Sequence, residues 1–315
     1  MSNDRSPDLT GIAVQWHHEP GAERLAASWP DDPRFELLMV NNGSDRELAT
    51  RGARVIDAGQ NLGFAGAINL GLRKARGGIV LILNSDITVE PGALESLLEG
   101  FRQHSETAGL APRLLDANGD SQYRWQLRPL PSVWTLMLHS LLVPVGEGPS
   151  REPDPGSVIG QPAAAALAFR RQVLEEVGGF DKSFYPAWFE DVDLAARLRI
   201  AGHTVLYWPD STLHHSLGSS IPRLGFRRFL WIYHANLGRY LKKHHGAGWA
   251  VAARSLLVPA CLLRTLLLPI RKLRRAPDRR TAAGALTDLL KGALSNWRLP
   301  RGHALAASKP DPSGE

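Results

Sequence analysis

Short apolar runs alternate with segments of helical spacing through the first part of the chain. Four apolar runs that end in polar or glycine-containing turns have the composition of β-strands: residues 11–16, 35–40, 53–56 and 79–83. Residues 62–75 and 91–104 instead repeat apolar side chains every three or four positions, as amphipathic helices do. Strands that alternate with helices predict βαβ units. The predicted fold class is therefore α/β, with a mixed, mainly parallel sheet flanked by helices.

Polar residues follow two of these runs. Asn41 to Asp45 come after the second run, and Asn84, Ser85 and Asp86 come after the fourth. Ligands of parallel sheets bind beyond the carboxyl ends of the strands, so both sets are candidate binding residues. Pro91 has a favourable position for a first helical residue, which predicts a strand, an acidic turn and a helix. A single aspartate in such a turn caps a helix more often than it binds a metal.

The densest polar cluster lies at the start of a later helix. Glu190, Asp191 and Asp193 follow an aromatic run and precede apolar residues at helical spacing. A helix N-terminus favours acidic side chains, and its dipole is expected to keep them ionised. Asp193 and Arg197 lie four residues apart and are expected to pair, which leaves Glu190 or Asp191 to face a cleft. Trp188, in the aromatic run, is expected to help form a wall on which a sugar ring can stack.

Two adjacent histidines, His214 and His215, come after a strand-like run at 204–208. Adjacent histidines are commonly surface residues. Their place after the last strand of the body can nevertheless bring one of them to the same sheet edge as Asp86 and Asp191. Between the two halves, a proline-rich part with six prolines between 129 and 155 predicts loops that cover or admit a substrate.

Composition and charge exclude several classes of protein and several kinds of partner. The 315 residues are 43% hydrophobic and 22% charged, which is typical of a globular protein of one or two domains. The single cysteine, Cys261, excludes an internal disulfide scaffold and a zinc cluster of cysteines. Residues 221–280 hold 14 Lys or Arg and one acid, so this segment carries a charge of +13. Because the net charge of the chain is +6, the remainder carries −7. A nucleic-acid partner is not expected from a mildly acidic body with one basic tail, whereas a membrane surface fits such a tail.

The most hydrophobic segment of the basic region, residues 249–270, is interrupted by charges and prolines. Its longest uncharged run, 255–263, is much shorter than the ~20 apolar residues of a spanning helix. Arg264, Arg271 and Arg275 are spaced to lie near one helical face, as in a helix that lies on a bilayer; the alternative is a helix packed on the body. The polar start of the chain, with Asp4 and Asp8, does not resemble an export signal.

These observations predict two regions: residues 1–220 as the body and residues 221–315 as a basic, helical, membrane-associating region with a polar tail. The expected location is the cytoplasm, at the inner face of the cell membrane. The oligomeric state is not predicted.

Six sequence blocks in this order resemble family 2 glycosyltransferases of the rhamnosyltransferase-like kind. The resemblance covers about residues 10–220 and rests on VNNGSD at 40–45, NLGFAGAIN at 61–69, LNSD at 83–86, GGFD at 178–181, FEDVDL at 189–194 and the histidine pair. It implies a GT-A fold, a nucleotide-diphosphate sugar donor such as dTDP-rhamnose or a UDP-sugar, and a divalent cation, Mg²⁺ or Mn²⁺. It also implies inverting transfer of one sugar to a hydroxyl of a glycan or lipid-linked saccharide in cell-surface polysaccharide synthesis.

By position, the resemblance makes Asp191 the catalytic base, with Glu190 beside it. It assigns the metal to Asp86 and to His214 or His215, and this choice stays open. The residues predicted to bind the nucleotide sugar are Asn41, Asn42, Ser44, Asp45, Asn61, Gly63, Phe64, Asn69, Asn84, Ser85, Asp86 and Trp188.

The chain departs from the family pattern at two positions. Residues 14–17 read VQWH where similar proteins end a strand in Thr-Tyr-Asn, and Asn41 replaces an aspartate, which removes a charge-assisted hydrogen bond to the donor. A catalytically inactive sugar-nucleotide-binding or membrane scaffold protein of the same fold is therefore the alternative. A dinucleotide-dependent oxidoreductase is disfavoured because no Gly-x-Gly-x-x-Gly follows the first strand. The Gln-x-x-Arg-Trp motif of processive synthases is absent after the acidic helix, which favours single transfers.

Overall fold

An eight-stranded sheet organises the structure, with strand order β3-β2-β1-β4-β9-β6-β10-β5. The computed structural model describes residues 6–16, 20–44, 52–145, 148–216, 224–270, 273 and 275–297. The strands of the sheet are β1 (Leu9–Gln15), β2 (Phe35–Asn41), β3 (Arg54–Asp57), β4 (Ile79–Asn84), β5 (Ile87–Val89), β6 (Gly109–Leu115), β9 (Ala166–Arg170) and β10 (Val205–His215). A separate two-stranded ribbon pairs β7 (Leu127–Arg128) with β8 (Gln161–Pro162).

The sheet is mixed and mainly parallel, as predicted. The pairs β1–β2, β1–β4, β2–β3 and β6–β10 are parallel, whereas β9 runs antiparallel to β4 and β6, and β5 runs antiparallel to β10. Nearly all of the aliphatic strand β4 is buried, as expected for a strand covered on both faces. Asn41 lies opposite Gln15, and Asn84 lies opposite Val14. The carboxyl ends of β1, β2 and β4 therefore share one edge of the sheet.

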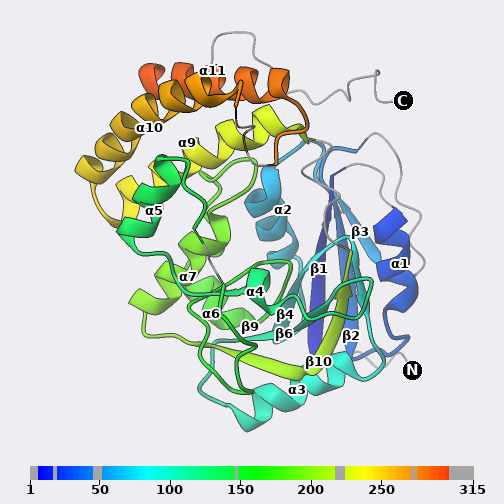
Figure 1. Ribbon diagram of the computed structural model, residues 1–315. Coiled ribbons are helices and arrows are strands. Elements are labelled where there is room, and N and C mark those ends of the chain that lie inside the picture. Colours follow the sequence, from blue (N-terminus) through cyan, green and yellow to red (C-terminus); the bar gives the residue numbers. More distant parts are fainter. Residues whose placement is uncertain are drawn as a thin grey trace.

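Helices cover both faces of the sheet (Figure 1). On one face, α1 (Pro20–Ser28) and α3 (Ala93–Gln103) contribute Leu25 and Leu97 to a core with the strands. On the other face, α2 (Gly63–Leu72), α6 (Arg171–Glu176) and α7 (Glu190–Ile200) contribute Ile68, Leu174 and Leu194. Two apolar layers thus enclose the sheet and leave its carboxyl edge to the polar turns.

Four local expectations need correction. The turn at Asp86 is followed by β5 rather than directly by a helix, because Ile87 and Val89 are buried and pair with the end of β10. Helix α3 begins at Ala93, after Gly92 at φ 81°, and not at Pro91. The histidine pair lies at the end of β10 rather than after it. The proline-rich part forms a helix where loops were expected, α5 (Val133–Ser140), and a short helix, α4 (Tyr123–Gln126), precedes it.

Three helices follow the sheet: α9 (Phe226–His244), α10 (Ala247–Leu267) and α11 (Arg279–Ser295). They pack against one another, and α5 packs on α9 and α10 (Figure 1). Helix α10 ends before Arg275, so the predicted arginine face does not continue to that residue; Arg271 lies outside the described residues. Leu237 and Tyr240 of α9 share a hydrophobic cluster with Phe189 and Val192. The boundary at residue 220 remains a prediction, and α9 is packed directly on α7.

We expect Glu36→Ala to destabilise the fold. The Glu36 side chain is 5% exposed, pairs with Arg54 and Arg76, and accepts a hydrogen bond of 2.9 Å from the buried Thr10 hydroxyl. Loss of the acceptor leaves Thr10 without this bond, which costs about 1–3 kcal/mol. Urea unfolding measures the change. Glu99→Ala, which removes an exposed ion pair, is the control and should change the free energy of unfolding by less than about 0.5 kcal/mol.

Candidate active site

Asp86 and His215 lie side by side at the carboxyl edge of the sheet. His215 Nε2 is 3.3 Å from Asp86 Oδ1, and the two side chains are 3% and 10% exposed. Asn84, the last residue of β4, places its Nδ2 3.3 Å from the same imidazole nitrogen. Three predicted site residues from distant parts of the chain therefore meet at one point.

The orientation of the His215 ring is fixed by two residues at or beside α4. Gln122 Nε2 donates to the His215 carbonyl at 2.8 Å, so its Oε1 is the atom that faces His215 Nδ1 at 3.0 Å. Trp125 stacks on the ring at 5.3 Å between centroids. Because Oε1 can only accept, this network places a proton on Nδ1, so that in the neutral imidazole the lone pair of Nε2 points toward Asp86.

The other histidine lies on the opposite side of β10. Side chains alternate along a strand, and His214 Nε2 contacts Glu90 Oε1 at 2.6 Å in a half-exposed position. The structure therefore brings His215, and not His214, to Asp86.

The donor set at Asp86 is compatible with a divalent cation. When the imidazole is neutral, its Nε2 lone pair and the Asp86 carboxylate oxygen, 3.3 Å apart, are both acceptors, so a cation shared between them would relieve their repulsion. Within the described residues, no group of three or more His, Cys, Asp or Glu side chains could hold a metal ion. A cation here would therefore take its remaining ligands from substrate phosphates and water, as Mg²⁺ commonly does.

Asp191 begins α7 and faces the β7–β8 ribbon. Its Oδ2 accepts a hydrogen bond from Gln161 Nε2 at 3.1 Å and lies 3.7 Å from Arg128 Nη2. Arg128 ends the same short segment that starts at Gln122, so residues 122–128 contact both His215 and Asp191. Asp191 also lines a cavity of about 280 Å³ that runs along α7 between Leu194, Leu198 and β9; Asp86 and His215 do not line it.

Glu190 differs from the expectation for an ionised acid at a helix start. Its side chain is buried, and Oε2 has no hydrogen-bond partner in the described part of the chain. Burial, and then the charge of Asp191, raise the pKa of Glu190 well above its usual range. Desolvation outweighs the helix dipole at this position, so Glu190 does not face a cleft as an ionised base.

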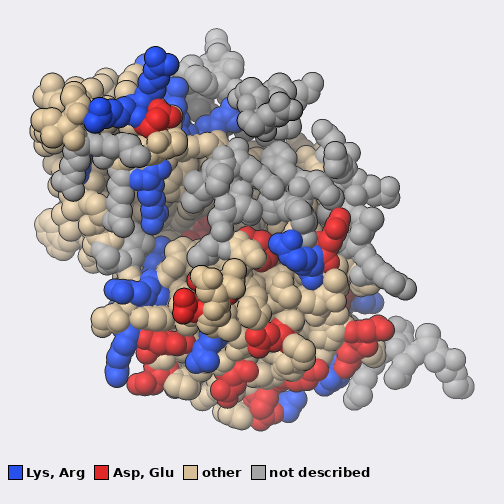
Figure 2. Space-filling model, turned by 45° about the vertical axis from the view of Figure 1, so that its right-hand side comes forward, with Lys and Arg blue, Asp and Glu red and all other residues tan. Residues whose placement is uncertain are grey.

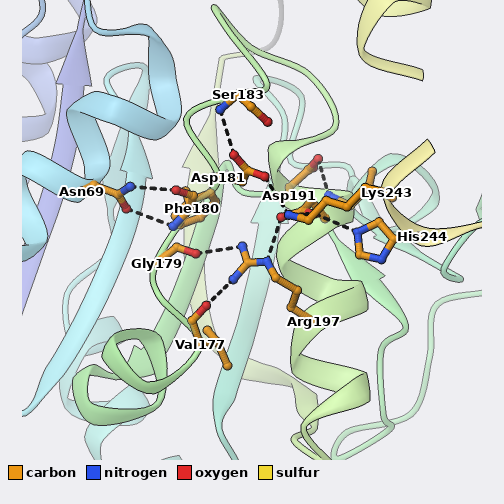
Figure 3. Close-up of polar contacts among 12 residues, drawn as sticks. Asn69, Val177, Gly179, Phe180, Asp181, Ser183, Asp191, Arg197, Lys243 and His244 are labelled. Atoms are coloured by element: carbon orange, nitrogen blue, oxygen red, sulfur yellow. Dashed lines mark hydrogen bonds and ion pairs between the residues drawn. The ribbon is translucent and has the colours of Figure 1, made fainter. Parts of the chain in front are cut away.

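Asp193 is a structural residue, and its predicted pairing with Arg197 is confirmed. Arg197 Nε donates to Asp193 Oδ2 at 2.8 Å, and its other nitrogens bind the carbonyls of Val177 and Gly179 (Figure 3). Figure 3 also shows Lys243 and His244 of α9 beside the first turn of α7.

Several predicted donor-binding residues hold loops in place. Asn42 Oδ1 accepts from the Leu62 backbone at 2.7 Å, and Asn61 Oδ1 accepts from the Gly63 backbone at 2.8 Å. Asn69 makes two bonds to the backbone of Phe180, at 2.7 and 2.9 Å. These amides shape the loops around β2 and α2.

The remaining predicted residues are placed as follows. Asn41 closes a turn through bonds to Ser44 O and N, whereas Asp45 lies outside the described residues. Ser85 is buried, and its carbonyl lies close to Gly21, where a Cβ would come within 2.7 Å.

Two predicted aromatic residues contact the segment before α7 or belong to it. The Phe64 backbone donates to Pro186 O at 2.7 Å, and Trp188 packs its ring on Phe229 at 4.9 Å. Trp188 is half-buried. The predicted sugar-stacking wall remains a prediction.

The comparisons with known proteins identify a family. The model for glycosyl transferase family 2 matches residues 22–178. The chain is 27% identical over 304 residues to N-acetylglucosaminyl-diphospho-decaprenol L-rhamnosyltransferase of Mycobacterium tuberculosis, an alignment that covers 86% of this chain and 96% of the relative. The chain belongs to glycosyl transferase family 2. It is also 34% identical over 217 residues to a pre-mycofactocin glycosyltransferase of that organism, covering 66% of this chain and 42% of that relative.

Solved glycosyltransferases share the fold. The mannosyltransferase PcManGT from Pyrobaculum calidifontis, in complex with GDP-Man and Mn²⁺, has a TM-score of 0.52 at 15% identity, covering 93% of this chain and 88% of that chain. GalNAc-T7 with UDP, GalNAc and Mn²⁺ has a TM-score of 0.55 at 14% identity, covering 93% of this chain and 57% of that chain. The predicted GT-A fold is confirmed.

Sequence reasoning missed four contacts of this family 2 glycosyltransferase site: Gln122, Trp125, Arg128 and Gln161. They lie on the two sides of the proline-rich part, three before it and Gln161 after it, and the β7–β8 ribbon pairs Arg128 with Gln161. Pairing between segments more than thirty residues apart leaves no local sequence signal.

We expect Glu190→Gln to stabilise the protein increasingly as the pH rises. The folded state keeps the Glu190 proton that the unfolded chain releases near the ordinary glutamate pKa of 4.5. The stability linked to this proton is therefore full below that pH and falls as the pH rises toward the folded pKa. Glutamine does not titrate. The difference in free energy of unfolding should grow by up to about 1.4 kcal/mol per pH unit in urea titrations between pH 5 and 8. Glu99→Gln, at an exposed position, is the control, and a pH-independent difference for Glu190→Gln would contradict the assignment.

Proposed function

We propose that this chain transfers a single sugar from a nucleotide-diphosphate sugar to a hydroxyl of a glycan or lipid-linked saccharide, with inversion at the anomeric carbon. The observation that carries the proposal is that one short segment, residues 122–128, contacts both the Asp86 and His215 pair and the Asp191 carboxylate. A donor diphosphate at the first and an acceptor hydroxyl at the second would then be neighbours.

Asp191 is the residue that would accept the proton of the attacking hydroxyl. Gln161 and Arg128 contact only Oδ2, and Oδ1 accepts from the Val192 backbone at 2.8 Å, so the carboxylate has a fixed orientation. A positioned general base typically contributes about 10²–10⁴-fold in rate. Attack from the side opposite the leaving diphosphate gives the inverted product.

Asp86 and His215 would hold a divalent cation, Mg²⁺ or Mn²⁺, beside the donor diphosphate. Such a cation offsets the negative charge that develops on the leaving phosphate oxygens. Two solved structures of the same fold contain Mn²⁺ with GDP-Man or UDP, which supports this assignment. Gln122 and Trp125 keep the His215 ring in place for this role, as outer contacts of metal-binding histidines commonly do.

The donor and acceptor are proposed from the relatives. One relative is named as an L-rhamnosyltransferase that acts on N-acetylglucosaminyl-diphospho-decaprenol, so dTDP-rhamnose is the first donor to test and a UDP-sugar is the second. The same name supports a lipid-linked saccharide as the acceptor and a role in cell-surface polysaccharide synthesis.

A lipid-linked acceptor would require the protein at the inner face of the cell membrane. Helix α10 is long and apolar enough to cross a membrane by length and composition, with 22% of its apolar window buried. One side of α10 is exposed, including Val251 and Leu266, and Trp134 of α5 beside it is 68% exposed. We define these residues, with Leu262, Leu263 and Ile270, as the α5–α10 face.

The surroundings of this face favour a helix that lies on an anionic bilayer over one that crosses it. Helix α10 packs on α5, α9 and α11, so only one of its sides is available to lipid. Residues 221–280 carry +13, which attracts anionic headgroups. Acidic side chains gather over the lower part of the molecule in Figure 2, whereas the upper left, where α9 to α11 lie, is mainly uncharged with Lys and Arg beside it.

We expect Asp191→Asn to abolish transfer while leaving donor binding intact. The substitution keeps the size of the side chain and removes the proton acceptor. A thermal-shift screen of nucleoside diphosphates with and without Mn²⁺ identifies the donor, and transfer assays then compare the variant with wild type. Asp154→Asn, which alters an exposed carboxylate, is the matched control. Near-normal transfer by Asp191→Asn would remove this residue from the base role, and a wild-type protein that binds a donor without turnover would favour the scaffold alternative.

We expect the double variant Trp134→Ser and Leu266→Ser to bind anionic vesicles roughly 10- to 100-fold more weakly than wild type, since each side chain loses its apolar burial in the bilayer. Cosedimentation with vesicles of phosphatidylglycerol and phosphatidylcholine measures the change. Ile200→Ser removes a side chain on α7 that is 79% exposed and should bind as wild type does. Wild-type protein that stays in the supernatant would contradict membrane association, and unchanged binding of the double variant would contradict the role of this face.

A further inference from the structure

The backbone immediately before the proposed base adopts a conformation that ordinary residues avoid. Trp188 has φ 71° and Phe189 has φ 73°, both in the left-handed region that favours glycine. Glu190 and Asp191 follow directly. Residues held in this region persist where the surrounding structure fixes them, so the direction in which Asp191 leaves this turn depends on what holds it.

The turn is held by a polar side chain of α9. Asn236, which is 1% exposed, donates from Nδ2 to the carbonyl of Ala187 at 2.9 Å and to that of Trp188 at 3.0 Å. Its Oδ1 accepts from Arg239. A guanidinium can only donate, so Arg239 fixes the amide with its NH₂ group toward the two carbonyls.

The aromatic side chains of the turn pack on the same helix. The Trp188 ring lies 4.9 Å from that of Phe229, and the Phe189 ring lies 5.1 Å from Tyr233 and 5.7 Å from Tyr240. These α9 residues recur every three or four positions together with Asn236, so one face of α9 follows the course of the turn.

The last turn of α9 contacts the chain both before and after the left-handed turn. Lys243 Nζ lies 2.6 Å from Asp181 and 2.6 Å from Asp193, and His244 Nε2 lies 2.7 Å from Asp193 Oδ1 (Figure 3). Asp193 is fully buried and lies two residues after the proposed base. Helix α9 therefore contacts the segment from residue 181 to residue 193 before, within and after the left-handed turn.

We propose that Asn236 is a positioning residue for sugar transfer and that α9 is part of the catalytic unit as well as the start of the basic region. This inference rests on the proposed role of Asp191. Asn236 acts by holding two carbonyls of the turn, which sets where the Asp191 carboxylate lies relative to the acceptor hydroxyl. Without these bonds, the two residues can relax from their left-handed conformation and turn the first residues of α7.

The test compares Asn236→Ala with Leu289→Ala. Leu289 of α11 is fully buried and belongs to a separate cluster with Leu257 and Cys261 of α10, which contains neither Trp188 nor Phe189. Its substitution therefore weakens the packing of the last three helices without removing a contact to the turn. We expect Asn236→Ala to lower the kcat of transfer by roughly 10- to 100-fold, as displaced catalytic groups do. The KM for the donor and the thermal shift produced by nucleoside diphosphate should stay near the wild-type values. Leu289→Ala should lower the unfolding temperature and leave kcat near that of wild type.

Two further readouts separate positioning from a general loss of structure. Asn236→Ser keeps one hydroxyl donor and should recover part of the lost kcat. Amide hydrogen exchange at residues 188–193 should accelerate in Asn236→Ala and not in Leu289→Ala. An Asn236→Ala variant with wild-type kcat and wild-type exchange would overturn the inference. If the wild type binds a donor but transfers no sugar, the proposed function fails instead, and the exchange measurement still decides whether Asn236 holds the turn.

Discussion

The buried carboxylate of Asp193 is the point on which the arrangement of the site depends. A fully buried charge is costly unless it is paired and hydrogen-bonded, and here Arg197, Lys243 and His244 surround both oxygens. Arg197 also holds the carbonyls of Val177 and Gly179. The Asp193 carboxylate and its partners thus connect the start of α7 and the loop before it to the end of α9, which lies about fifty residues later in the sequence.

Side-chain amides stabilise the loops around β2 and α2, as the Asp193 ion pairs stabilise the start of α7. Asn42, Asn61 and Asn69 bind backbone groups of neighbouring loops through their amide atoms. Residue types that a family resemblance assigns to donor contacts therefore set the shape of the loops that would surround a donor. Charge fixes the side proposed for the acceptor, and neutral amides fix the side proposed for the donor.

Local periodicity was sufficient to predict the parallel strands, the helices between them and the pairing of Asp193 with Arg197, because each depends on neighbours in sequence. The choice between His214 and His215 depends on which face of β10 meets Asp86, which follows from the pairing of β10 with β5 and β6. Gln122 and Arg128 lie just before the proline-rich part, and their place at the site depends on contacts with the distant β10 and α7. Asn236 lies in a region whose charge drew attention to membranes, so its role at α7 had no signal in composition.

The close approach of α1 to the acidic turn at Ser85 and Asp86 restricts which residues position 21 can accept. A Cβ at Gly21 would come within 2.7 Å of Ser85 O and 2.9 Å of the Asp86 Cα, both of them backbone atoms that have no freedom to give way. The spacing between that helix and the turn is therefore set by the absence of a side chain. A survey of tolerated replacements that ranks positions by what their side chains touch would overlook Gly21, although even alanine there would displace the Asp86 carboxylate relative to the His215 imidazole.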